Sequence, residues 1–102
     1  MKAQAIFVEV VGTFFFLSVI LSVVADGATN PVAAALGPIA IAVGLLAAIY
    51  FGGKISGGHY NPAVSIMMLA KGNIDSVTAI SYIIAQIIGG LSALLVNNFL
   101  LS

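Results

Sequence analysis

Three apolar stretches, each about as long as a lipid bilayer is thick, constrain this chain more than any other feature. They run over residues 5–25, 32–53 and 76–101, and Glu9 is the single charged residue within them. A helix needs about 20 apolar residues to cross the hydrocarbon core of a membrane. The sequence therefore predicts an all-α integral membrane protein with three transmembrane helices.

The composition excludes most other classes of protein. Only 6% of the 102 residues are charged, whereas about 25% are charged in a typical soluble domain. The net charge is zero, so no basic surface is expected for a nucleic acid. With no Cys, one His and three acidic residues, the chain offers no metal site within one copy and no nucleophile–base pair. We expect neither an enzyme nor a cofactor.

The segment between the second and third stretches, about residues 55–70, has a different character. It is too apolar for an aqueous loop and too short to span a bilayer. Asn61 is a good helix N-cap, Pro62 suits the first helical position, and residues 63–70 can form two helical turns. Non-helical backbone at membrane depth is tolerated only within protein or beside a water-filled cavity. The segment is therefore predicted to be a re-entrant loop and half-helix.

Three motifs together resemble one family of channels. The run Ser56-Gly-Gly-His-Tyr-Asn-Pro-Ala-Val-Ser65 resembles the first Asn-Pro-Ala loop of the aquaporin and glycerol-channel family, also called major intrinsic proteins. Glu9-Val-Val-Gly-Thr-Phe14 resembles the family's first helix, and Tyr82-Ile-Ile-Ala-Gln-Ile-Ile-Gly-Gly90 its third. The family has two inverted halves, each with three spans and one half-helix. Residues 1–102 resemble the first half only, as a single half-aquaporin unit.

The resemblance implies roles for the residues around the half-helix. The pore signature would be Asn61, Pro62 and Ala63, and the backbone carbonyls lining the approach would be those of Gly57, Gly58 and His59. The Asn61 amide would donate a hydrogen bond to the passing solute. Two half-helices meeting end to end would direct their positive dipole ends at the centre, which opposes cations and a proton wire.

Glu9 and Gln86 are polar side chains in the interior of the apolar stretches. An acid inside a membrane is a functional candidate by default, and a proton relay through Glu9 is one hypothesis. The resemblance favours a structural role for both, in which they hydrogen-bond the irregular backbone before Asn61. His59 has the chemistry of a pH sensor, but we expect it to pack under the half-helix.

The resemblance also assigns a selectivity filter. Ile41 falls at the first filter position, Ile49 is its counterpart in an inverted copy, Val64 stands where that copy needs an Arg, and Gly58 is the small fourth member. The chain contains no Arg. Two identical halves would thus form two apolar mouths. We expect such mouths to pass small neutral solutes such as glycerol, urea or ammonia, and an apolar ring can gate by dewetting.

One copy cannot enclose a pore, so a second half is required. It is either the same chain, forming an antiparallel homodimer in the lipid, or a separate second-half protein. The resemblance implies that four pore units gather around an axis, which would be eight copies of this chain. Lys2, Lys54 and Lys71 are expected on one side and Asp26 on the other, which favours a cytoplasmic N-terminus. A homodimer of inverted copies needs dual topology.

Three functions remain open from the sequence. The first is a passive channel for water or small neutral solutes. The second is a non-conducting half-channel subunit that needs a different partner half. The third is a small proton-coupled transporter that uses Glu9. Ion-driven flux that depends on Glu9 would separate the third function from the other two.

Overall fold

The computed structural model describes residues 2–101 as four α-helices and a short π-helical turn. They are α1 (Lys2–Gly27), α2 (Pro31–Ser56), α3 (Pro62–Lys71), α4 (Ser76–Val96) and η1 (Asn97–Leu101). The described residues contain no strand. Three helical segments are long and apolar enough to cross a membrane, with mean hydropathies of 2.4, 2.4 and 2.0, and α3 is a shorter apolar helix. The predicted all-α membrane fold is confirmed.

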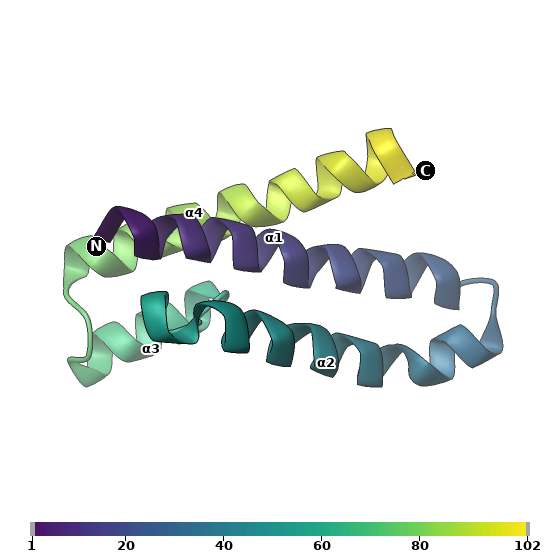
Figure 1. Cartoon of the computed structure of the whole chain (residues 1–102), viewed down its shortest axis with the longest axis horizontal. Helices are drawn as coiled ribbons and strands as arrows, with labels where there is room; N and C mark the ends of the chain where they lie inside the picture. Colours follow the sequence, from purple (N-terminus) through teal and green to yellow (C-terminus); the bar gives the residue numbers. More distant parts are fainter. Residues whose placement is uncertain (1, 102) are drawn as a thin grey trace.

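The helices form a bundle in which α1 lies between α2 and α4 (Figure 1). α1 packs against both of these helices, and α3 packs against α4. α1 and α4 run in one direction, and α2 and α3 run in the other (Figure 1). The 26 residues of α2 extend about 39 Å at 1.5 Å per residue, which is enough for a bilayer core of about 30 Å.

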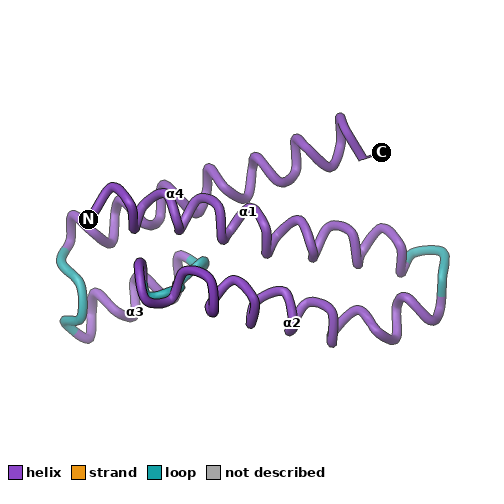
Figure 2. The backbone as a smooth tube through the Cα atoms, in the orientation of Figure 1, coloured by secondary structure: helices purple, strands orange, loops and turns teal. Residues whose placement is uncertain are grey.

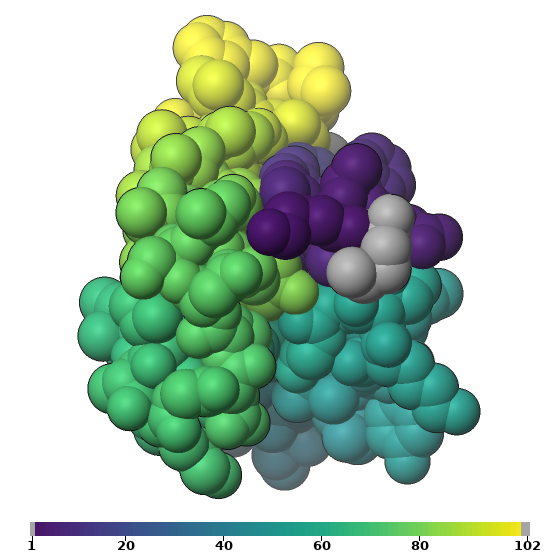
Figure 3. Space-filling view, turned by 90° about the vertical axis from the view of Figure 1, so that its left-hand side faces the viewer, coloured from purple at the N-terminus to yellow at the C-terminus, as the bar shows by residue number. Residues whose placement is uncertain are grey.

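The chain turns back into the bundle after α2. Gly57 ends α2 in the left-handed conformation, with a φ of 93°. The following loop runs inward, and α3 then returns to the same end of the bundle (Figure 2). Viewed from that end, the beginning of α1, the end of α2 and the α3–α4 connection gather on one face (Figure 3). The lysines of α1, α2 and α3 therefore lie at this end, and Asp26 lies at the opposite end.

Small residues bring α2 and α4 close to α1. A Cβ at Gly44 of α2 would lie 3.2 Å from the Val19 side chain, and a Cβ at Gly89 of α4 would lie 2.5 Å from the Val10 carbonyl oxygen. Such close approach is how helices associate in lipid, where no hydrophobic effect drives them together. A Cβ at Gly37, two turns before Gly44, would lie 2.5 Å from the Val23 side chain, whereas Ala40 between them is exposed.

The observed boundaries differ slightly from the predicted stretches. α1 and α2 each extend a few residues beyond 5–25 and 32–53. The third stretch, 76–101, has two geometries, because the α-helix ends at Val96 and a π-helical turn follows. α3 includes Pro62 as its first residue and ends at Lys71.

Candidate functional site

The start of α3 is the centre of the candidate site. Asn61 is extended (φ −159°, ψ 124°), and its Oδ1 accepts a hydrogen bond of 2.8 Å from the Ala63 backbone N–H. Pro62 follows at the first helical position, where its missing N–H costs no hydrogen bond. Asn61, Pro62 and Ala63 are all exposed in a single copy of the chain. The predicted N-cap is thus present, and its outer face is open.

Glu9 of α1 organises the loop before Asn61. Its carboxylate is fully buried and accepts hydrogen bonds from the backbone N–H groups of His59 (3.1 Å) and Tyr60 (2.8 Å). The Ser56 hydroxyl also donates to it at 2.7 Å, and the Gly58 N–H donates to that hydroxyl at 3.1 Å. Backbone donors that the loop cannot pair within itself therefore find partners on α1 and at the end of α2.

Gln86 of α4 is connected to the loop indirectly. Its Nε2 donates 2.9 Å hydrogen bonds to Glu9 Oε1 and to the Ser65 hydroxyl of α3. The resemblance implied that Gln86 bonds the loop backbone itself. The structure instead gives Gln86 side-chain partners, so it links α1, α3 and α4 across the bundle.

The His59 ring is buried beside α3. Its Nδ1 lies 2.8 Å from the Ser65 hydroxyl, and its ring meets the Tyr82 ring edge-on with 5.0 Å between centroids. The Tyr82 hydroxyl donates at 2.6 Å to the Ser56 carbonyl oxygen, which links the end of α2 to α4. The ring therefore packs where the sequence led us to expect it.

The two glycines of the loop both have positive φ values. Gly57 has a φ of 93° and Gly58 a φ of 65°, a conformation that residues with a Cβ rarely adopt. Gly57 is exposed and Gly58 half-buried. The loop can make this turn because neither residue carries a side chain.

A single copy brings together only part of the expected filter. Gly58 lies against α2, where an added Cβ would be 3.6 Å from the Ile49 Cα. Ile41 lies two turns before Ile49 in α2, about 12 Å away along the helix axis. Val64 lies in the first turn of α3, which packs against α4. A filter made of all four residues would need a second copy.

A groove of about 520 Å³ adjoins Asn61 between α1 and α4. Its lining includes Thr13, Phe16, Leu17, Asn61, Pro62 and Gln86. Among the described residues, Thr13 Oγ1 and Gln86 Oε1 are buried polar atoms without a hydrogen-bond partner. The groove thus combines apolar walls with a few polar groups. Within residues 2–101, no cluster of three His, Cys, Asp or Glu side chains is suited to hold a metal.

The site includes four side chains whose roles the sequence did not reveal: Ser56, Tyr60, Ser65 and Tyr82. For two of them, the helical repeat of the sequence could have indicated a role. Ser65 lies one turn after Asn61, and Tyr82 one turn before Gln86, so each shares a face with a residue already recognised. Tyr60 has no such signal, because its partners lie on α1 and α2.

Comparison with known proteins identifies the family of this chain. The family model described as major intrinsic protein matches residues 1–102. The chain is 48% identical over 87 residues to glycerol uptake facilitator protein-like 6 of Lactiplantibacillus plantarum. This alignment covers 83% of the present chain and 38% of that protein. It is 42% identical over 74 residues to aquaporin TIP1-1 of Arabidopsis thaliana, covering 72% of this chain and 30% of that protein.

A bacterial aquaporin gives a similar result. The chain is 51% identical over 57 residues to aquaporin Z of Photorhabdus laumondii, covering 54% of this chain and 25% of that protein. The matched region thus spans well under half the length of these three curated relatives. No solved structure matches the chain significantly. The family match over all 102 residues shows that the chain belongs to the major intrinsic protein family.

Proposed function

We propose that this chain supplies one half of a passive transmembrane channel for water and small neutral solutes, and that an inverted copy supplies the other half. The observation that carries the proposal is the exposed start of α3, which lies inside the bundle rather than at either end (Figure 1). Exposed polar backbone at membrane depth must meet protein or water, because lipid cannot hydrogen-bond to it.

The chemistry of this helix start suits neutral, hydrogen-bonding solutes. Asn61 Oδ1 is used by the Ala63 N–H, so the Asn61 Nδ2 group remains to donate to a solute oxygen. Hydrogen bonds from the loop backbone to Glu9 hold the approach to Asn61 in one conformation. The positive end of the α3 dipole disfavours cations at the same point.

The solute class follows from the filter and from the relatives. Ile41, Ile49, Val64 and Gly58 would form apolar mouths without a fixed positive charge. The relatives include proteins named as aquaporins and one named as glycerol uptake facilitator-like. We therefore expect water together with solutes of the size of glycerol, urea or ammonia.

The second half would dock along the groove beside Asn61. The groove of about 520 Å³ lies beside Asn61, and Asn61, Pro62 and Ala63 are exposed in the single copy. Pore units of two inverted copies would gather as four, with eight chains in all. The lysines lie at one end of the bundle, so one copy would have a cytoplasmic N-terminus and its mate would insert against the positive-inside bias.

The test is stopped-flow light scattering on proteoliposomes that contain this chain alone. Vesicles are shocked with an impermeant sugar and, separately, with glycerol, and empty vesicles serve as the control. Fast shrinkage with a low activation energy is the expected result, and the glycerol trace then reports on the filter. Folded, inserted protein without flux would mean that the second half is a different chain or further sequence. Flux driven by a pH gradient and abolished in Glu9→Gln would identify a proton-coupled transporter instead.

A further inference from the structure

Tyr60, the residue before Asn61, has an unusual backbone conformation. Its φ is 53°, and it is the one non-glycine residue with positive φ among residues 2–101. Bulky residues rarely adopt this left-handed conformation, and they keep it only where the surrounding structure holds them. The Tyr60 side chain is only 3% exposed. Its surroundings therefore explain why the strained conformation persists.

Hydrogen bonds hold Tyr60 at both ends. Its backbone N–H donates to Glu9 Oε1 of α1 at 2.8 Å. Its phenol hydroxyl donates to the Ala48 carbonyl oxygen of α2 at 2.6 Å. The residue thus connects the loop to two helices that are distant in sequence.

Two glycines create the space for the Tyr60 ring. A Cβ added at Gly12 of α1 would collide with the ring, and the three nearest atoms to it all belong to Tyr60. A Cβ added at Gly52 of α2 would collide with the Tyr60 hydroxyl and with Val8. We call the space between these glycines the Gly12–Gly52 slot. A methyl group on either side would displace the ring.

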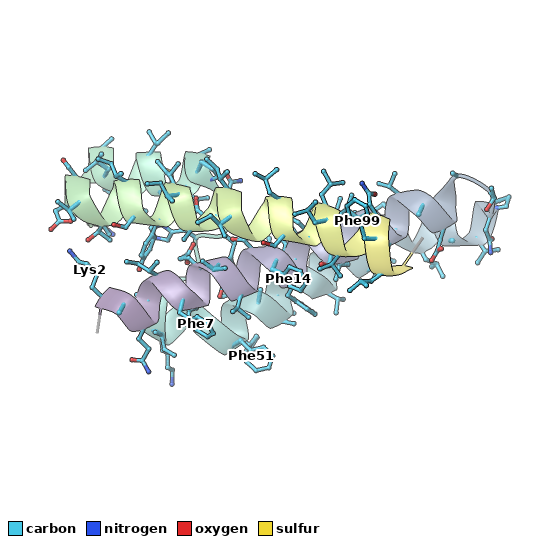
Figure 4. The ribbon with its side chains drawn as sticks, turned by 90° about the horizontal axis from the view of Figure 1, so that it is seen from above. Lys2, Phe7, Phe14, Phe51 and Phe99 are labelled. Atoms are coloured by element: carbon cyan, nitrogen blue, oxygen red, sulfur yellow. The ribbon has the colours of Figure 1, made fainter. Side chains whose placement is uncertain are left out.

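Tyr60 also borders two hollows of the surface. One is the groove beside Asn61, and the other is an apolar groove of about 320 Å³ between α1 and α2. Phe7 and Phe51 line the apolar groove from neighbouring helices, as Figure 4 shows. Tyr60 lines both grooves and therefore lies between them.

From these contacts we propose that Tyr60 is a positioning residue for Asn61. The ring in the Gly12–Gly52 slot and the hydroxyl on α2 together fix the peptide that leads into Asn61. They thereby set the direction in which the Asn61 amide points. The effect on the structure of the loop is independent of conduction, whereas the effect on solutes rests on the proposed channel function.

The experiment compares three variants in lipid nanodiscs by hydrogen exchange of the loop amides. Tyr60→Phe removes only the hydroxyl, and Gly12→Ala displaces the ring. Gly53→Ala is the matched control, because its added Cβ would only touch the Ile49 side chain at an ordinary 3.6 Å. Exchange of the His59 and Tyr60 amides, which donate to Glu9, should accelerate about fivefold in the first two variants, as expected for the loss of one buried hydrogen bond. The control should exchange like the parent.

A double-mutant cycle tests whether Gly12 acts through Tyr60. In a Tyr60→Ala background the slot is empty, so adding Gly12→Ala should change exchange little further. Equal effects of Gly12→Ala with and without the ring would overturn the role of the slot. If Tyr60→Ala fails to fold, Tyr60→Phe and Gly12→Ala still decide the proposal.

Flux measurements test the positioning of Asn61. The ratio of glycerol to water flux should shift in Tyr60→Phe and stay at the parent value in Gln4→Leu, an exposed position outside the filter. Accelerated exchange with an unchanged ratio of glycerol to water flux would overturn the positioning role. Tyr60 would then only stabilise the loop. If the parent does not conduct, the channel function fails, and exchange alone decides whether Tyr60 holds the loop. Parent-like exchange in both Tyr60→Phe and Gly12→Ala would overturn the proposal in either case.

Discussion

Two helices of this chain begin with the same dipeptide, Asn-Pro, and their local geometry is nearly the same. Asn30 precedes Pro31 at the start of α2, and its Oδ1 accepts from the Val32 and Ala33 N–H groups at 2.9 and 3.3 Å. Asn61 precedes Pro62 at the start of α3, and its Oδ1 accepts from the Ala63 N–H at 2.8 Å. Both asparagines have extended backbones and are exposed.

The two helix N-termini differ in the hydrogen bonds that hold the segment preceding each of them. Before Asn30, the turn bonds to the end of α1 itself: the N–H groups of Thr29 and Asn30 both donate to the Asp26 carbonyl oxygen. Before Asn61, the loop bonds to Glu9, about 50 residues away in sequence. One start lies at the end of the bundle and the other lies inside it (Figure 2). The same cap thus becomes a candidate site only where distant side chains hold it within the bundle.

Replacing Glu9 should produce the largest difference between the two starts. In Glu9→Leu, four donors lose a hydrogen bond in a buried site, and the His59 and Tyr60 N–H groups are left without an acceptor, so we expect a loss of roughly 3 kcal/mol or more in the free energy of unfolding. Circular dichroism during denaturation in detergent micelles measures this loss. Gln4→Leu, at an exposed position of the same helix, is the control. Parent-like stability of Glu9→Leu would mean that the loop before Asn61 does not depend on α1.

Replacing Gln86 should have the next largest effect. In Gln86→Leu, Glu9 Oε1 and the Ser65 hydroxyl each lose a donor, and we expect a cost of about 1–3 kcal/mol in the free energy of unfolding. The same denaturation experiment applies. The Glu9→Leu/Gln86→Leu double variant should lose less than the sum of the two, because the two side chains are hydrogen-bonded. Additive losses would show that they act separately.

Replacing the two caps in parallel sharpens the comparison further. Asn30→Ala and Asn61→Ala should each cost about 1 kcal/mol in the free energy of unfolding, the usual value of an N-cap. Only Asn61→Ala should also alter solute flux in proteoliposomes, because only that amide faces the proposed pore. Equal changes in flux would show that flux follows helix stability rather than the position of the asparagine.

A third cap, Asp75 at the start of α4, should give the smallest effect, and it should depend on pH. Its carboxylate accepts a 2.8 Å hydrogen bond from the Thr78 N–H, and bonding to Thr78 lowers the pKa of Asp75, aided by the charge of Lys2. Figure 4 shows Lys2 extending towards the beginning of α4. Because the pKa is lower in the folded state, the stabilisation is present above about pH 4 and is lost as the pH falls through the lower, folded value.

The measurement for Asp75 is thermal unfolding between neutral and strongly acidic pH. Asp75→Asn keeps a good cap but cannot titrate, so its unfolding temperature should depend less on pH in the acidic range than that of the parent. The Asn caps of α2 and α3 should contribute no pH dependence. Identical pH profiles for Asp75→Asn and the parent would show that the cap does not titrate with folding.

Much of the fold follows from local patterns in the chain. The three long apolar stretches indicate the spanning helices, and Asn61, Pro62 and the glycine after Lys71 mark the two ends of α3. Glu9 and Gln86 stand out because polar side chains are rare in such stretches. Tyr60 and Ser56 do not stand out, since a tyrosine or a serine beside a turn is common in any loop.

The contacts that build the site join residues distant in the sequence. The bonds from Ser56 to Glu9 and from Gln86 to Glu9 cross 47 and 77 positions. Whether Gly12 contacts lipid or the Tyr60 ring depends on how α1 packs against α2, and no local pattern contains that information. Helix length and helix ends depend on hydrophobicity, capping and glycine, which act within a few residues. The position of Asn61 inside the bundle depends on hydrogen bonds and close packing among α1, α2 and α4, which exist only once those helices are folded together.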